Sequence, residues 1–220
     1  MVSWDQDLAF EWDRASYQRT LLAMVEASEA SVTGWLGRSR TRPLEIKVMT
    51  RARYEAAFGS AMAWGAGAHY RAGAIHVNGG ARLDGWFGGM LAHEMTHAIL
   101  DDDGRGGLLP TWLNEGLAER LGLLARGQRD LDSNQRQELE GSLEQRHLVP
   151  LPARGVTSRF SYLQGYAAVL FLEQKVGKER LLALVRSTQE RGWDRARDAE
   201  LGWSERKLEE EFSYWVDHLQ

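Results

Sequence analysis

The sequence has no cysteine, and this absence limits the chemistry that the protein can perform. Without thiols the chain forms no disulfide, offers no thiol nucleophile and cannot build a zinc site from thiolates. A metal site in this chain must therefore use histidine and carboxylate ligands. The redox compartment stays open, because a chain without thiols folds equally well in reducing and in oxidising surroundings.

Long apolar runs and an excess of positive charge are lacking too. No window of the sequence approaches the roughly 18 apolar residues of a membrane-spanning helix, and the first residues have neither the basic start nor the apolar run of a signal peptide. The 27 basic and 31 acidic residues give a net charge of −4, which does not suit a general nucleic-acid binder. We expect a soluble protein without a nucleic-acid partner, cytoplasmic if the given start is native and extracytoplasmic if an upstream signal or anchor is missing.

The pattern of apolar residues favours an α+β fold in a chain of 220 residues. Alternation in LEIKVMT (44–50) predicts a strand, Thr50 is expected to cap a short helix that ends before Gly59, and the glycine-punctuated segment 65–80 predicts a hairpin whose second strand runs from Ala74 to Val77. Helical spacing predicts helices over the first ~38 residues and later in the chain, at 84–100, 111–126, from 133, 161–177, 178–192 and from 204.

The segment HEMTH (93–97) is the strongest chemical signal in the sequence. On a helix, His93 and His97 lie one turn apart on the same face, so both imidazoles can bind one zinc ion while Glu94 serves as general base. The alternative is a helix with two histidines that bind no metal. Trp86 and Met90 fall on the same helical stripe as the two histidines, which predicts that the pair points toward the apolar interior, where two imidazoles need a partner.

A second segment, TWLNEGLAE (111–119), begins the next predicted helix with two carboxylates four residues apart. Catalytic zinc sites with two histidines take a carboxylate as third ligand and leave the fourth position for water, so Glu115 is the expected donor. Glu119, one turn later, could accept the remaining N–H of a ligand histidine and fix its tautomer. The alternative for Glu119 is a solvated charge or an i,i+4 ion pair.

HEMTH followed by WLNEGLAE resembles the gluzincins, the zinc peptidases in which HExxH is completed by a glutamate on the next helix. The 17 residues between His97 and Glu115 are close to the spacing in thermolysin-like enzymes and zinc aminopeptidases. A third segment, SYLQGY (161–166), is similar to the aminopeptidase segment whose tyrosine stabilises the oxyanion, with Tyr162 in that tyrosine's place. The resemblance covers residues from about 74 to 177. The sequence lacks the GxMEN-like segment and the large β-sandwich domain of the zinc aminopeptidases. The resemblance is therefore to the small peptidase-MA-like or minigluzincin group.

The resemblance implies a zincin-like fold, with one gluzincin-like catalytic domain over residues 1–220. An N-terminal lobe of about 1–104 would hold a small mixed sheet and the HExxH helix, a helical C-terminal lobe of about 105–220 would follow, and the active-site cleft would lie between them. One zinc ion per chain would be bound by His93, His97 and Glu115. The strand around Ile75, His76 and Val77 would be the edge strand that pairs with an extended substrate.

The implied function is a zinc-dependent metallopeptidase that acts on peptides or unfolded protein segments. Glu94 would take the proton of a zinc-activated water, and Tyr162 would donate a hydrogen bond to the oxyanion, with Tyr166 as the alternative donor. Other interpretations are a zinc-stabilised, non-catalytic binding module (a pseudopeptidase) on the same fold and a hydrolase of non-peptide substrates. The presence of Glu94 favours the peptidase, because a binding module has no need of a general base.

Overall fold

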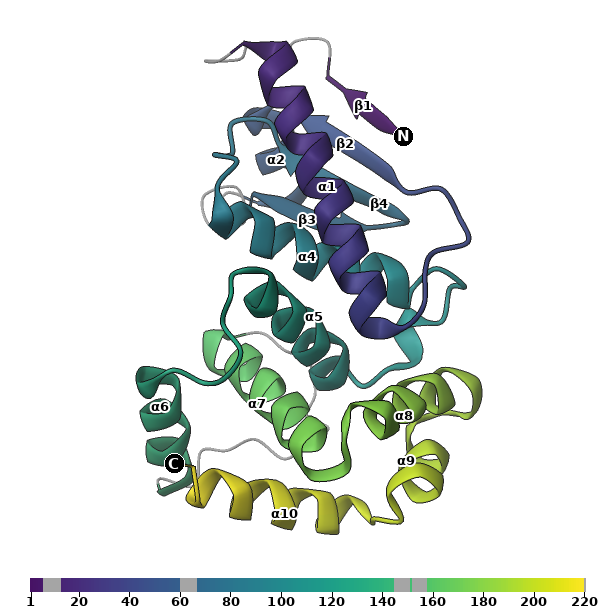
Figure 1. Cartoon of the computed structure of the whole chain (residues 1–220), viewed down its shortest axis with the longest axis vertical. Coiled ribbons are helices and arrows are strands. Elements are labelled where there is room, and N and C mark those ends of the chain that lie inside the picture. Colours follow the sequence, from purple (N-terminus) through teal and green to yellow (C-terminus); the bar gives the residue numbers. More distant parts are fainter. Residues whose placement is uncertain (6–12, 60–66, 145–150, 152–157, 220) are drawn as a thin grey trace. The chain divides into compact units, whose positions relative to one another are not determined.

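The computed structural model describes residues 1–5, 13–59, 67–144, 151 and 158–219 (Figure 1). Helices and a small mixed sheet make the protein α+β, as the sequence predicted. The chain divides into two compact units. Unit 1 comprises Met1–Asp103 and Leu121–Gly127, and unit 2 comprises Gly104–Arg120 and Gln128–Gln220.

Unit 1 contains the sheet, whose described strands are β1 (Val2–Trp4), β2 (Glu45–Met49), β3 (Ala68–Arg71) and β4 (Ala74–Asn78). They are arranged in the order β1-β2-β4-β3, with β2 parallel to both β1 and β4, and β3 antiparallel to β4. The predicted strand over 44–50 and the predicted hairpin strand Ala74 to Val77 are confirmed. Ala72 and Gly73 join β3 to β4 with φ of 51° and 80°, the left-handed pair that a two-residue type I′ turn requires.

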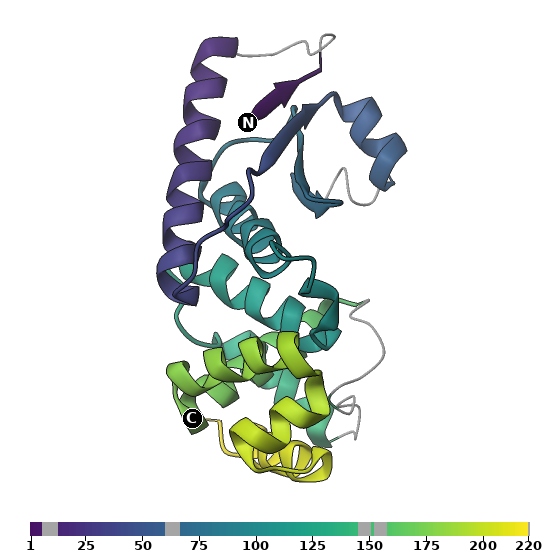
Figure 2. The same cartoon turned by 90° about the vertical axis from the view of Figure 1, so that its right-hand side faces the viewer.

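Three described helices accompany the sheet: α1 (Arg14–Leu36), α2 (Arg51–Phe58) and α4 (Gly85–Leu100). Side-chain oxygens of Asp13, Thr50 and Asp84 accept hydrogen bonds from the first-turn N–H groups, which explains where each helix begins. The expected cap at Thr50 and the end before Gly59 are confirmed. Viewed from the side, α1 and α2 cover opposite faces of the sheet (Figure 2).

The beginning of the chain differs from the prediction, which extended a helix over the first ~38 residues. Residues Val2–Trp4 form β1 instead, and α1 begins only at Arg14. The apolar positions at helical spacing all lie within α1, and a three-residue strand is too short to produce a periodic signal. β1 is defined by its parallel pairing with β2, in which Val2 lies opposite Ile46 and Trp4 opposite Val48.

The described secondary structure of unit 2 is helical. It comprises the 3₁₀ turn η1 (Gly106–Leu108) and the helices α5 (Thr111–Ala125, whose last residues belong to unit 1), α6 (Ser133–Glu144), α7 (Arg159–Val176), α8 (Lys178–Arg191), α9 (Trp193–Leu201) and α10 (Glu205–Asp217). The predicted helices at 111–126, from 133, 161–177, 178–192 and from 204 are confirmed. The short helix α9 was not predicted, because it is polar and lies between two glycines, Gly192 and Gly202, that read as the boundaries of a loop.

Glycines allow α5 to approach two other helices closely. In unit 1, a Cβ added to Gly122 of α5 would lie 2.8 Å from the carbonyl oxygen of Gly89 on α4. In unit 2, a Cβ added to Gly116 would collide with the backbone of Gly165 on α7. The helix that carries Glu115 therefore touches backbone against backbone at each of these contacts, and larger residues would force the helices apart.

Candidate metal centre

In the part of α4 that carries HEMTH, only the two histidines are not fully buried. Between residues 91 and 100 every residue of α4 except His93 and His97 is buried. Met90 is half-buried and Trp86 is 48% exposed on the same stripe. His93 and His97 are half-buried, so the prediction that the pair points toward the interior is met only in part. Because α4 is apolar around most of its circumference, periodicity alone does not show which stripe is less buried, and in the HEMTH part it is the stripe with the two imidazoles.

The two imidazoles are placed as a metal ion requires. The Nε2 atoms of His93 and His97 lie 3.1 Å apart, and the ring planes are nearly perpendicular, at 75°. Two nitrogen ligands at the usual zinc–nitrogen distance around a tetrahedral ion are about 3.3 Å apart. The observed separation fits that value, which means that one ion could bind both atoms with little rearrangement of α4.

Glu115 completes a group of three potential ligands with the histidine pair. One ligand atom each from His93, His97 and Glu115 lies within 4.8 Å of the other two, and all three residues are half-buried. In the described part of the chain this is the one group of three or more such side chains that could hold a metal ion. Two imidazoles and one carboxylate are the donor set of catalytic zinc sites, and the same set also suits Fe(II), so the metal itself must be identified by measurement.

Glu94 is buried, with 7% of its surface exposed, and is held by the edge of the sheet. Its Oε2 accepts a hydrogen bond of 2.6 Å from the backbone N–H of Tyr70 on β3. The phenol of Tyr70 donates to Oδ2 of Asp101, which ends α4, over 2.9 Å. Burial and the adjacent Asp101 carboxylate raise the pKa of Tyr70 to about 12, so the phenol remains a donor at neutral pH.

The residues expected to form the substrate-binding edge lie elsewhere in the sheet. Ile75, His76 and Val77 belong to β4, which is paired with β2 on one side and with β3 on the other. The expectation of an edge strand at these residues is therefore wrong, and the edge strand next to α4 is β3. The sequence predicts the hairpin, but the choice of which strand joins the rest of the sheet depends on β2, about 25 residues earlier.

His76 on β4 packs against other rings. It lies opposite His69 of β3, and both rings contact the ring of Phe58, with centroids 5.1 and 5.0 Å away. Burial is the largest of the causes that lower the pKa of His76, and the neighbouring charge of Lys47 contributes as well. The lowered pKa favours the neutral form of the His76 imidazole, which agrees with its packing against Phe58 of α2.

The remaining candidates lie in unit 2. Glu119 and Tyr162 are half-buried on α5 and α7, whereas Tyr166 is completely buried and burial raises its pKa to about 12. Beside Tyr166, the guanidinium of Arg120 donates to Glu173 over 2.9 Å and to a backbone carbonyl over 2.7 Å. Tyr166 is thus part of a buried core, while the roles of Tyr162 and Glu119 stay predictions.

Sequence reasoning did not identify the residues that hold the end of α4. Arg38 donates to the carbonyl oxygen of Ile99 over 2.7 Å, and Arg40 donates to that of Ala98 over 3.1 Å. Two guanidinium groups therefore satisfy carbonyls at the C-terminal, partially negative end of the HEMTH helix. Their partners lie about 60 residues later in the chain, so no local pattern could have revealed these contacts.

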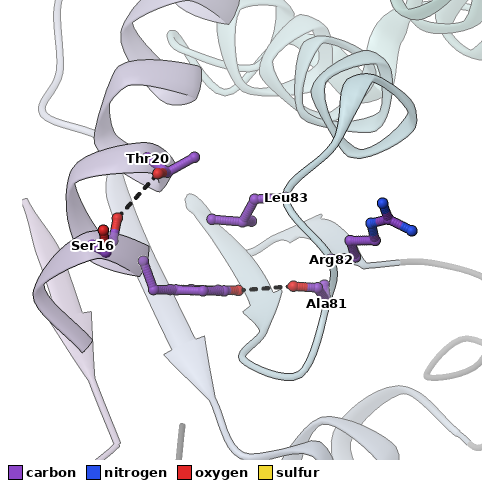
Figure 3. A pocket seen from close by; sticks show the side chains of 6 residues that line it. Ser16, Thr20, Ala81, Arg82 and Leu83 are labelled. Carbon is purple, nitrogen blue, oxygen red and sulfur yellow. Dashed lines mark hydrogen bonds between the residues drawn. The ribbon is translucent and has the colours of Figure 1, made fainter. Parts of the chain in front are cut away.

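A separate cavity of about 270 Å³ lies in unit 1 between α1 and the segment that precedes α4 (Figure 3). The phenol of Tyr17 donates to the carbonyl oxygen of Ala81 over 3.4 Å beside it. The residues that line this cavity are Ser16, Tyr17, Thr20, Ala81, Arg82 and Leu83. None of the candidate ligands is among them, so this cavity is not part of the candidate centre.

Comparisons with protein-family models, with curated proteins and with solved structures found no match to this chain. Among the described residues no helix is both long and apolar enough to cross a membrane. The functional assignment must therefore be argued from the candidate centre and its surroundings.

Proposed function

We propose that the protein is a zinc-dependent metallopeptidase of the gluzincin type, with a zincin-like fold, that hydrolyses bonds in peptides or unfolded protein segments. The observation that carries the proposal is the convergence of His93, His97 and Glu115, with Glu94 following the first ligand directly on α4. A peptidase needs a centre that substrate can reach, and His93 and His97 are the two residues between 91 and 100 that are not fully buried.

Zinc, when bound in a site of this kind, acts as a Lewis acid that acidifies water and polarises a carbonyl group. Glu94 accepts the proton of the attacking water and later transfers it to the leaving amine, the role of a general base that becomes a general acid. Tyr162 donates its hydroxyl hydrogen to the developing oxyanion. Glu119 accepts an N–H of a ligand imidazole and so fixes its tautomer.

The second candidate, a zinc-stabilised binding module without turnover, is favoured by one specific observation. Glu94 has a structural partner, because its carboxylate accepts the Tyr70 N–H. A buried glutamate that ties the sheet edge to α4 would be useful in a protein that catalyses nothing. The presence of Glu94 therefore discriminates less between the two functions than it does in the sequence alone.

Metal analysis and an unbiased peptide library together test the proposal. We expect the purified protein to contain one zinc per chain, and the double substitution His93→Ala, His97→Ala to remove it. Glu94→Gln should retain the zinc and lower peptide turnover by several orders of magnitude. Glu138→Gln, on an exposed position of α6, is the matched control and should change neither. Full zinc retention in the double variant would refute the metal site, and stoichiometric zinc without cleavage of any library peptide would favour the binding module.

A further inference from the structure

The outer edge of β3 is covered by side chains of α4. The Sδ atom of Met90 accepts the N–H groups of Gly67 and Ala68 over 2.9 and 3.1 Å, and Glu94 accepts that of Tyr70 over 2.6 Å. The two spacings match, because four residues of helix rise about 6 Å and two residues of strand extend about 6.6 Å. α4 and β3 therefore run side by side, with helix side chains in the place of a partner strand.

Tyr70 is attached to α4 a second time through its side chain. Its phenol donates to Asp101, seven residues after Glu94, which is two helical turns further along α4. One residue of the edge strand is thus fixed at two points of the helix. The second contact, at the residue that ends α4, holds β3 against the helix at another point.

We propose that Tyr70 is a positioning residue for Glu94, with its backbone N–H holding Oε2 of the carboxylate and its phenol fixing β3 at the distance that this contact needs. The inference rests on the proposed function, in which Glu94 is the general base. A general base must lie within hydrogen-bond reach of the proton that it takes. Glutamate has three rotatable bonds, and a charge-assisted hydrogen bond from a rigid strand removes that freedom before the substrate arrives. The hydrogen bond to Tyr70 occupies Oε2 and not Oε1.

The contact can be removed selectively, because the Tyr70 N–H is not part of the sheet. Asn78 donates to the carbonyl of Gly67, which sets the alternation along β3 so that the N–H of Tyr70 points away from β4. Proline is tolerated at such an edge position, since it deletes a donor that the ladder does not use. Tyr70→Pro therefore removes the hydrogen bond to Glu94, together with the phenol. Tyr70→Ala is the matched control, because it removes the phenol and keeps the N–H.

Steady-state kinetics of the zinc-loaded variants test the proposal. A displacement of about 1 Å in a reacting group costs about 10²-fold in rate. We accordingly expect Tyr70→Pro to have a kcat about 10- to 100-fold below that of Tyr70→Ala, with zinc content unchanged and KM within about threefold. In the Glu94→Gln background the difference between the two variants should largely disappear. Equal kcat values, or the same loss in both backgrounds, would overturn the positioning role. A wild-type protein without turnover would instead refute the proposed function itself, because Glu94 would then not be a general base.

Amide hydrogen exchange supplies a readout that needs neither metal nor activity, and it applies even if Tyr70→Pro does not fold. An outward N–H on an edge strand exchanges rapidly unless something accepts it. We expect slow exchange of the Tyr70 amide in the wild-type protein and in Glu94→Gln, which keeps an acceptor oxygen, and exchange at least about tenfold faster in Glu94→Ala. The Ala68 amide, bonded to Met90, is the internal control and should not change. Equal Tyr70 exchange in all three proteins would show that Glu94 does not hold this N–H.

Discussion

Gly122→Ala should separate α4 from α5 and destabilise unit 1. The added Cβ would lie 2.8 Å from the carbonyl oxygen of Gly89 and 3.3 Å from Cβ of His93. Because ordinary contact between these atoms begins near 3.4 Å, the helices must move apart by roughly 0.6 Å. Overpacking of this kind costs about 1–3 kcal/mol, which at least offsets the ~1 kcal/mol that alanine gains over glycine inside a helix. We expect a lower free energy of unfolding and weaker zinc binding, since the shift moves the backbone that carries His93.

Gly34→Ala on α1 is the matched control, because an added Cβ there meets nothing within 4 Å. The same substitution should stabilise the protein by about 0.5–1 kcal/mol at that position. Urea unfolding of the two variants and of the wild-type protein measures both effects, and a zinc titration of the folded proteins measures the second consequence. Our reasoning about the helix crossing is refuted if Gly122→Ala is as stable as Gly34→Ala and binds zinc equally well.

Three further predictions, made with four substitutions, test other parts of the structure. Tyr162→Phe should lower turnover by about 10²–10³-fold, whereas Tyr166→Phe, at a buried core position, should leave it nearly unchanged; steady-state cleavage of one peptide decides between them, and the reverse order would exchange their roles. Arg38→Ala should lower the free energy of unfolding by about 1–2 kcal/mol, because the carbonyl of Ile99 loses a charged donor at the end of α4, and an unchanged urea midpoint would contradict this. For Asp102, burial alone would raise the carboxyl pKa. The N–H and hydroxyl of Thr41 and the N–H of Arg42 donate hydrogen bonds to the carboxylate, and they outweigh burial and hold the pKa below 3.8. Its stabilisation is therefore complete above about pH 5 and lost as the pH falls through and below 3.8, so the stability difference between wild type and Asp102→Asn should shrink over that range in pH-dependent unfolding.

Local signals in the sequence predicted local structure well. Thr50 was expected to cap a short helix, and its side chain accepts the N–H of Arg53 in the first turn of α2. The expected ligands His93 and His97 lie one turn apart on α4, and Glu115 lies in the second turn of α5. The cap and the histidine pair depend on relations within about four residues, where helix geometry leaves few alternatives, whereas Glu115 was expected from the donor set of two-histidine zinc sites.

Long-range relations were beyond the reach of the same reasoning. β4 lies inside the sheet because β2 pairs with it in parallel, a choice that its own sequence does not encode. The stripe with His93 and His97 is only half-buried, whereas Phe87, Leu91 and Met95 on the rest of α4 are buried, and the spacing of apolar residues did not distinguish the two. Such features follow from the arrangement of whole elements rather than from residue periodicity.

Glu94 shows why the identity of a residue is weaker evidence for catalysis than its surroundings. In the sequence, a glutamate between the two histidines of an HExxH motif has one evident use, as a general base. In the structure, the same side chain also joins α4 to the edge strand through Tyr70, which a binding module would need equally. The two uses make different demands on Glu94→Gln, because glutamine preserves the acceptor for the N–H but cannot take a proton from water. A variant that keeps its fold and its slow Tyr70 exchange while losing turnover would therefore separate the catalytic use of Glu94 from the structural one.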